Sequence, residues 1–208
     1  MEFRDRIETL EQFREVMRPA SRLVTDKEFD TFDDECREFI ARSPFVLVAS
    51  TDGFGKIDIS PKGDEPGFVR VLDDQTLVIP DRFGNHRTDT FLNVLEHPYV
   101  GLIFLVPGHK NTLRLRGQAE IVRDVEVRER LAANGSVPDL VLAVHLTTGY
   151  FHCGKCIIRS DLWTREHQQR SADDRLLARA MVRHGRLDLT VEQMHDIIDD
   201  DDERTRLY

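Results

Sequence analysis

Three segments of the chain carry polar and cationic side chains at spacings that suit the binding of an anion. The first, Ile57 to Asp64, places the hydroxyl of Ser60 and the ammonium of Lys62 where a predicted strand enters a loop with Pro and Gly. Ligands are commonly met at strand ends, and a nearby cation suits a phosphate or another electron-rich group. Taken alone, however, this segment fits an ordinary surface lysine better.

The second segment, Leu77 to Thr88, has the pattern of a strand, a Gly-containing turn and the start of a helix. Such a turn directs backbone N–H groups and the positive end of a helix toward one point. Asn85 can cap the helix or donate its amide to an anion, and Arg87 offers several donors suited to phosphate. The local pattern is equally compatible with a capped helix whose arginine faces water.

The third segment, Asn111 to Glu120, alternates polar and apolar residues as a strand does, so Thr112, Arg114 and Arg116 share one face. Two arginines on one face are costly to bury unless an anion meets them. They therefore face solvent, which is the commoner case, or they line a binding interface.

Cys153-Gly154-Lys155-Cys156 follows His152 and is the remaining pattern that could carry chemistry. A zinc site needs further ligands at recognisable spacing, and the nearest, His145, has no paired partner. A thioredoxin-like dithiol needs a βαβ context that the surrounding pattern lacks. We therefore predict no metal site. The chain also has no convincing Ser-His-Asp set or paired carboxylates.

The elements that must position these residues are mostly short strands between residues 45 and 123. Turn residues separate the runs, which gives a β-meander with one inserted helix over 86–95. A last strand is expected over Leu140 to Leu146, after a helix over Val125 to Ala133. The predicted runs are Phe45 to Ser50, Lys56 to Ser60, Gly67 to Leu72, Thr76 to Pro80, Tyr99 to Val106 and Thr112 to Arg123. This pattern favours a small barrel over a doubly wound sheet.

Helical patterns flank the strands on both sides. Thr25 and Glu28 have capping-box spacing before a helix that Ser43-Pro44 ends, and an earlier helix is suggested by apolar residues between Ile7 and Met17. Two helices are expected near the C-terminus, the last one capped by Thr190 with Gln193. We predict one domain over 1–208, with N-terminal helices in 1–42, the core in 43–163 and a helical extension in 164–208.

Composition narrows the class of protein. The 208 residues are 40% hydrophobic and 32% charged, with a net charge of −9. No apolar run suits a membrane span, no signal-peptide pattern is seen, and three cysteines are too few for a disulfide framework, so a cytoplasmic location is expected. Residues 81–123 hold six Lys or Arg against four acids, which suits a small anionic ligand better than a nucleic acid. Ordinary solvated charges would also explain this balance.

In their order and spacing, the three anion-binding segments resemble the FMN-binding fingerprint of the pyridoxamine 5′-phosphate oxidase-like split-barrel family. Lys62 matches the lysine that ends the first strand motif, and Asn85, His86 and Arg87 match the small polar and basic residues of the strand-turn-helix. The segment Asn111 to Glu120 is similar to a strand that reads Arg-Gln-Val-Arg-Val-x-Gly-x-Ala-Glu. The resemblance covers about residues 40–163.

The resemblance implies a mainly β protein with peripheral helices, built on a six-stranded antiparallel split β-barrel of the FMN-binding type. It also implies a homodimer with FMN at the subunit interface. The implied cofactor-binding residues are Ser60, Lys62, Pro80, Asn85, His86 and Arg87 from one subunit and Asn111, Thr112 and Arg114 from the other. His152 and Lys155 are placed near the flavin or in the substrate pocket, where they could donate to an anionic substrate.

This chain departs from the true oxidases at several positions. Ile57 stands where they usually have arginine, His86-Arg87 stands for Arg-Lys, and Thr112 stands for Gln. The closing Trp- and Arg-rich motif that contacts pyridoxal phosphate has no counterpart after Trp163. The chain looks closer to bacterial relatives with a Phe-His-Cys-x-Lys segment, here Phe151 to Lys155.

The expected function is therefore an FMN-dependent oxidoreductase acting on a small organic molecule rather than on vitamin B6. A split barrel that uses the deazaflavin F420 or haem is an alternative. So is a non-catalytic flavin-binding or interaction module whose run of six acids between Asp196 and Glu203 docks to a basic partner, although a solvated helix end explains that run equally simply.

Overall fold

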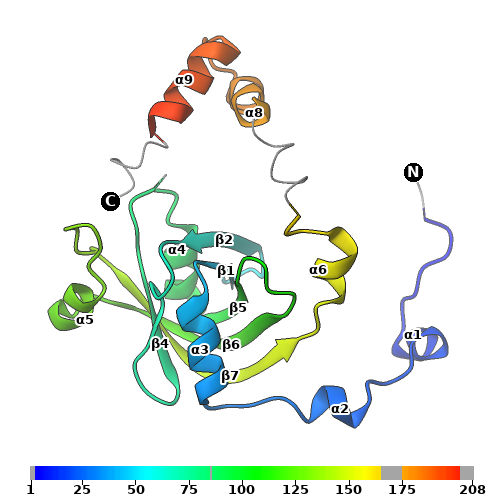
Figure 1. Ribbon diagram of the computed structural model, residues 1–208. Helices are drawn as coiled ribbons and strands as arrows, with labels where there is room; N and C mark the ends of the chain where they lie inside the picture. Colours follow the sequence, from blue (N-terminus) through cyan, green and yellow to red (C-terminus); the bar gives the residue numbers. More distant parts are fainter. Residues whose placement is uncertain (1–2, 85, 165–174, 202–208) are drawn as a thin grey trace.

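One antiparallel sheet forms the centre of the computed structural model, which describes residues 3–84, 86–164 and 175–201 (Figure 1). Its strands are β1 (Phe45–Thr51), β2 (Ile57–Gly63), β3 (Arg70–Val71), β4 (Thr76–Pro80), β5 (Tyr99–Leu105), β6 (Thr112–Val122) and β7 (Val141–His152). They lie in the order β2-β1-β5-β6-β7-β4-β3. The predicted antiparallel, mainly β fold is confirmed, but the predicted six-stranded barrel is not: the sheet has seven strands and is not closed.

The sheet curls around a main apolar core, and a second, smaller buried cluster lies on Val78, Val141 and Ala143 of β4 and β7 with Leu131. The strands β1 and β4 lie near opposite edges of the sheet. Val46 on β1 and Leu77 on β4 are nevertheless both fully buried in the same main cluster. Alternate residues of β1 are buried, as the period-two pattern predicts for a strand with one covered face. Phe104 and Leu113, from neighbouring strands, are also fully buried in this cluster.

The strand β7 is longer than the sequence pattern predicts, running past Leu146 to His152. Its first half pairs with β4 and its whole length pairs with β6. The register shifts between Arg116 and Gly117, where the backbone of Gly117 lies against the carbonyl of His145. The residue types of β7 predict a strand only over its first half. Pairing with β6 at eleven positions extends it to His152.

Helices lie around the sheet and at both ends of the chain (Figure 1). They are α1 (Leu10–Val16), α2 (Arg22–Thr25), α3 (Asp34–Arg42), α4 (Asp89–Glu96), α5 (Val125–Arg130), α6 (Lys155–Ser160), α8 (Leu176–Gly185) and α9 (Val191–Asp201). None of these described helices has the length and apolar character needed to cross a membrane. Residues 190 and 193 form the predicted cap: Gln193 N donates to Thr190 Oγ1, and Thr190 N donates to Gln193 Oε1.

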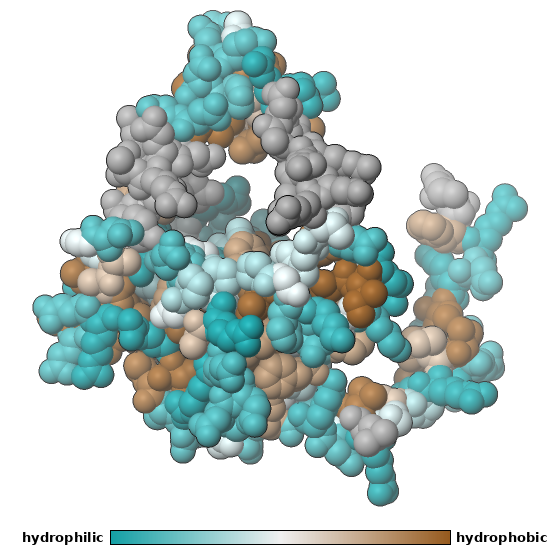
Figure 2. All heavy atoms as spheres, in the orientation of Figure 1, coloured by the Kyte–Doolittle hydropathy of each residue, from teal (hydrophilic) through white to brown (hydrophobic). Residues whose placement is uncertain are grey.

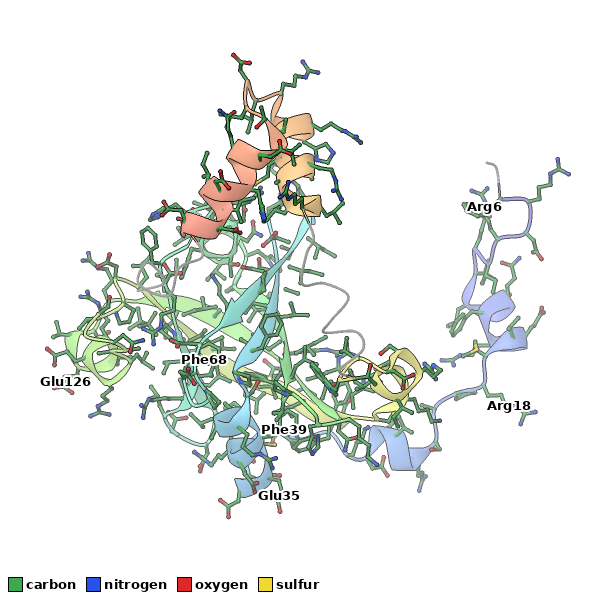
Figure 3. The ribbon with its side chains drawn as sticks, turned by 45° about the horizontal axis from the view of Figure 1, so that its top comes forward. Arg6, Arg18, Glu35, Phe39, Phe68 and Glu126 are labelled. Atoms are coloured by element: carbon green, nitrogen blue, oxygen red, sulfur yellow. The ribbon has the colours of Figure 1, made fainter. Side chains whose placement is uncertain are left out.

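The helix α3 covers the core, but it does not begin where the sequence predicts. Thr25 is the last residue of α2, and Asp33 caps α3 by accepting from the backbone N–H of Cys36. An aspartate is as good an N-cap as a threonine, so two candidate starts compete and the buried helix face selects the later one. Figure 3 shows Phe39 directed toward the sheet, where it is buried, while Glu35 points away from it.

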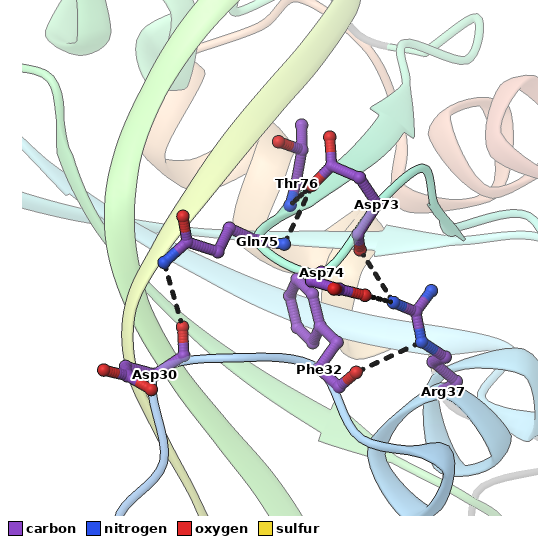
Figure 4. Close-up of polar contacts among 7 residues, drawn as sticks. All are labelled: Asp30, Phe32, Arg37, Asp73, Asp74, Gln75 and Thr76. Atoms are coloured by element: carbon purple, nitrogen blue, oxygen red, sulfur yellow. Dashed lines mark hydrogen bonds and ion pairs between the residues drawn. The ribbon is translucent and has the colours of Figure 1, made fainter.

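Arg37 ties α3 to the turn between β3 and β4 (Figure 4). Its guanidinium donates to the carbonyl oxygens of Phe32 and Asp73 and forms an ion pair of 2.7 Å with Asp74. In the same turn, the carboxylate of Asp73 accepts from the backbone N–H groups of Gln75 and Thr76. These contacts hold the hairpin turn against the helix, as is typical of Asx turns.

The N-terminal segment extends beside the sheet and carries exposed apolar side chains, as Figures 1 and 2 show. Leu10 and Val16 of α1 are 68% and 70% exposed. Near its end, Phe29 forms a β-bridge with Gly149 of β7. This bridge brings the residues just before Phe29 to the end of β7.

Candidate functional site

A cavity of about 720 Å³ lies where β2 and β4 end, and we name it the β2–β4 cavity. It is within the size range of small-molecule and cofactor sites. Five predicted cofactor-binding residues line it, namely Ser60, Lys62, Pro80, His86 and Arg87. Asn85 lies outside the described residues. Both of the first two segments therefore contribute side chains to this one cavity.

Two strands and the approach to α4 position these side chains. On β2, residues 58, 60 and 62 are the less exposed alternate positions, so Ser60 and Lys62 lie on one face. The strand β4 ends at Pro80, and the chain reaches α4 through His86 and Thr88, both in the left-handed region at φ 52° and 54°.

Carboxylates accompany the cations of the β2–β4 cavity. Lys62 Nζ lies 3.8 Å from Asp81 Oδ1. Burial raises the pKa of Asp81, and the charge of Lys62 opposes that rise. At the rim, Arg87 Nε lies 2.7 Å from Asp89 Oδ2, and this contact raises the pKa of Arg87. Because the Arg87 pair is exposed, water screens it and an incoming anion can exchange with the carboxylate at low cost.

Asp64 and Arg82 form a partly buried ion pair that the sequence patterns did not indicate. Arg82 Nε donates to Asp64 Oδ2 at 2.5 Å. The side chain of Arg82 is 16% exposed and that of Asp64 is 3% exposed. The pair joins the chain just after β2 to the chain just after β4. Only the opposite charges at the two strand ends could have indicated it, and nothing in the sequence shows that those ends meet.

The β2–β4 cavity offers donors and apolar wall that suit part of a flavin nucleotide. Ser60, Lys62 and Arg87 offer a hydroxyl, an ammonium and a guanidinium to a phosphate. Apolar wall comes from Pro80 and from the loop 136–140, which the sequence reading did not place at a site. Lys62 Nζ also lies 5.5 Å above the ring of Phe91, which directs the ammonium along the cavity wall. The residues present therefore fit FMN.

A second cavity of about 380 Å³ lies at the end of β7, and we name it the β7-end cavity. Asn111, His152 and Lys155 line it, so the third predicted segment and the predicted substrate residues meet here. Arg114 stands beside it: its Nη1 lies 3.5 Å from His152 Nδ1, and its guanidinium lies 5.4 Å over the ring of Tyr150. Thr112 is buried and pairs with His152 across the two strands.

The predicted cofactor ligands thus fall into two groups on one chain. Ser60, Lys62 and Arg87 line the β2–β4 cavity, Asn111 lines the β7-end cavity, and no lining residue is common to both. A single copy of the described chain does not bring the two groups to one ligand.

The cysteines show two kinds of environment. Cys153 and Cys156 are exposed, whereas Cys36 is buried in the core and burial raises its pKa. Within the ranges that the structure describes, no group of three or more His, Cys, Asp or Glu residues could hold a metal ion. His145, the nearest candidate fourth ligand in the sequence, instead contacts Glu120 at 2.8 Å.

Comparison with known proteins identifies the family to which the chain belongs. Residues 32–153 match the pyridoxamine 5′-phosphate oxidase family. This is more than half of the chain, and the chain therefore belongs to that family. The matched region contains both groups of predicted ligands. A comparison with curated proteins found no match.

Solved structures with distant similarity carry different descriptions. HupZ from Group A Streptococcus is 21% identical over 58% of this chain and 93% of that chain, with a TM-score of 0.47. An FMN-binding protein from Syntrophomonas wolfei is 15% identical over 55% and 86%, with a TM-score of 0.41. HutZ, the haem storage protein from Vibrio cholerae, is 14% identical over 59% and 96%, with a TM-score of 0.42. Descriptions among the matched structures thus include FMN binding, F420 reduction and haem storage.

Proposed function

We propose that this chain is an FMN-binding flavoprotein that acts as an FMN-dependent oxidoreductase on a small organic molecule. One observation carries the proposal: in a member of this family, the β2–β4 cavity gathers Ser60, Lys62, Pro80, His86 and Arg87 from two separate segments. A phosphate and a flat ring need this combination of cations, a hydroxyl and apolar wall.

Each side chain has a distinct task in this proposal. Arg87 and Ser60 bind the phosphate, and Arg87 exchanges its contact with Asp89 for one with the ligand. Lys62, which is partly buried, provides a positive charge beside the electron-rich edge of the ring. Bound FMN supplies the hydride chemistry, so the protein needs no nucleophile of its own.

We propose further that the active form is a homodimer with FMN at the interface, completed by Asn111, Thr112 and Arg114 of a second copy. The separation of the two ligand groups supports this, because one copy does not unite them. Exposed apolar side chains support it as well. On β2, Ile57 and Ile59 are 70% and 61% exposed, and on α4 Leu92 and Leu95 are 56% and 73% exposed.

The test is an absorption spectrum of the purified full-length chain combined with its mass in solution. FMN binding gives a flavin spectrum and a saturable titration with free FMN, and the dimer gives twice the monomer mass by light scattering. A Soret band would indicate haem and a deazaflavin spectrum would indicate F420, and either would contradict the FMN assignment. A monomer that binds FMN at full affinity would contradict the shared site.

Turnover is tested separately, by anaerobic photoreduction of the FMN-loaded chain followed by a screen of candidate acceptors. If the chain is an oxidoreductase, its reduced flavin is reoxidised faster with a small organic acceptor than in a sample without acceptor. Flavin binding with no acceptor other than oxygen would favour the non-catalytic binding module. In the acidic run considered for that module, residues 196–201 lie in α9, whereas residues 202 and 203 lie outside the described residues.

A further inference from the structure

The β7-end cavity is assembled from three parts of the chain that are far apart in sequence. Lys27 comes from the N-terminal segment, and Lys110 and Asn111 precede β6. The third part runs from the end of β7, at residues 151 and 152, into α6, where Lys155 and Ile158 lie. At about 380 Å³ the cavity suits a small molecule rather than a macromolecule.

Backbone contacts hold Lys27 at this cavity. Phe29 and Gly149 exchange two backbone hydrogen bonds of 2.9 and 2.7 Å, and the ring of Phe29 occupies the space that a side chain at position 149 would need. Two residues earlier, Lys27 Nζ donates to the carbonyl oxygen of Phe151 at 2.6 Å and lies 5.5 Å over the ring of Tyr150. An ammonium has three donors, so this contact leaves others for a ligand.

Close packing also fixes the opposite wall. A Cβ at Gly154 would lie 2.5 Å from the carbonyl oxygen of Lys110, so only glycine allows the end of β7 to approach that residue. Trp163 Nε1 donates to the carbonyl oxygen of His109 at 2.9 Å and holds the same loop. The cavity is therefore built by specific contacts between segments.

All charged side chains that line this cavity are cationic. They are Lys27, Lys110 and Lys155, with His152 beside them, and none of the described lining residues carries a carboxylate. In the described parts of the chain, the three lysines have no ion pair. The three lysines are exposed, so their ammonium groups are open to an anion that enters the cavity from solvent. In a chain of net charge −9, this concentration of cations is local.

His152 adds a donor to this set. A guanidinium only donates hydrogen bonds, so in its 3.5 Å contact with Arg114 the Nδ1 atom of His152 is the acceptor. With Nδ1 accepting, Nε2 carries the ring proton and is the nitrogen left to donate to a ligand.

We propose that the β7-end cavity binds the carboxylate or phosphate group of a small organic anion, and that this anion is the substrate. Lys27, Lys110 and Lys155 hold the anionic group, while Phe151 and Ile158 contact its apolar part. The assignment as substrate rests on the proposed function, whereas anion binding in this cavity does not.

Calorimetric titration of the FMN-free full chain tests the site with benzoate, phenyl phosphate and uncharged benzamide. Both anions should bind at least tenfold more tightly than benzamide and should perturb the fluorescence of Trp163, the sole tryptophan, through the loop at His109. Lys110→Gln and Lys155→Gln should each weaken anion binding about tenfold. Arg159→Gln, an exposed charge on α6 outside the cavity lining, is the matched control and should change nothing.

FMN titrations of the same variants separate this inference from the proposed function. In both lysine variants, the affinity for FMN should stay within about twofold of that of the native chain. A parallel loss of FMN and anion affinity would assign the cavity to the cofactor phosphate and overturn the inference. Equal binding of benzamide and benzoate, or full anion affinity in both variants, would overturn it as well. If the native chain binds the anions in this manner but no FMN, the proposed function fails and the anion site remains.

Discussion

Asp64 and Arg82 form a partly buried ion pair across the two strand ends that border the β2–β4 cavity, with Nε and Oδ2 2.5 Å apart. We predict that Asp64→Asn lowers the free energy of unfolding by about 3 kcal/mol, because it removes the carboxylate charge that the partly buried Arg82 guanidinium contacts. Urea denaturation measures this loss. Glu38→Gln, which removes an exposed pair with Arg42, is the control and should cost under about 1 kcal/mol. Equal small losses in both variants would show that the partly buried pair has no special role.

Arg87 and Asp89 provide a test of the phosphate site itself. Arg87→Ala should weaken FMN binding roughly tenfold, because a charge-assisted contact to the phosphate is lost. Asp89→Asn should tighten binding, because it removes an anion that competes for the same guanidinium. Fluorescence titration with FMN measures both, with Arg123→Ala outside the cavity as control. Unchanged affinity in Arg87→Ala would exclude Arg87 from the site.

Gly117 tests the register shift between β6 and β7. Gly117→Ala places a Cβ against the carbonyl of His145, so the two strands must move apart, and we expect a loss of about 2 kcal/mol in the free energy of unfolding. Gly101→Ala in β5 is the matched control, since its Cβ would lie 3.9 Å from Ala49 Cβ in ordinary contact. Thermal and urea unfolding of the pair give the comparison, and equal stability would contradict the close approach.

Asp73 should make stability depend on pH in the acid range. Backbone N–H donation from Gln75, and then from Thr76, lowers the pKa of Asp73 below its ordinary value. The folded chain therefore binds this proton less readily than the unfolded chain, and the stabilisation is present above the unfolded pKa of about 3.9. It is lost as the pH falls through the lower, folded-state pKa.

The check on Asp73 is urea unfolding of the native chain and of Asp73→Asn between pH 6 and pH 2.5. The variant should be less stable near pH 6, and the difference should shrink toward pH 2.5. A difference that stays constant over this range would show that the carboxylate charge is not the cause.

The sequence alone determined the local elements and the presence of anion-binding segments. Strand runs such as Phe45 to Ser50 and the Thr190 cap depend on neighbours within a few residues, so period and residue type are enough to predict them. The pairing of Ser60 with Lys62 on one face follows from the same alternation. The family, too, could be identified from motifs in the chain.

The tertiary structure decided which segments meet. Local patterns do not show that Asp64 reaches Arg82, that Lys27 lies beside Phe151, or that pairing with β6 carries β7 on to His152. Each of these depends on sheet order and on close packing at glycines, and the energy that selects them comes from contacts between residues distant in sequence. For the same reason, the sequence could mark cations as ligands but could not divide them between two cavities.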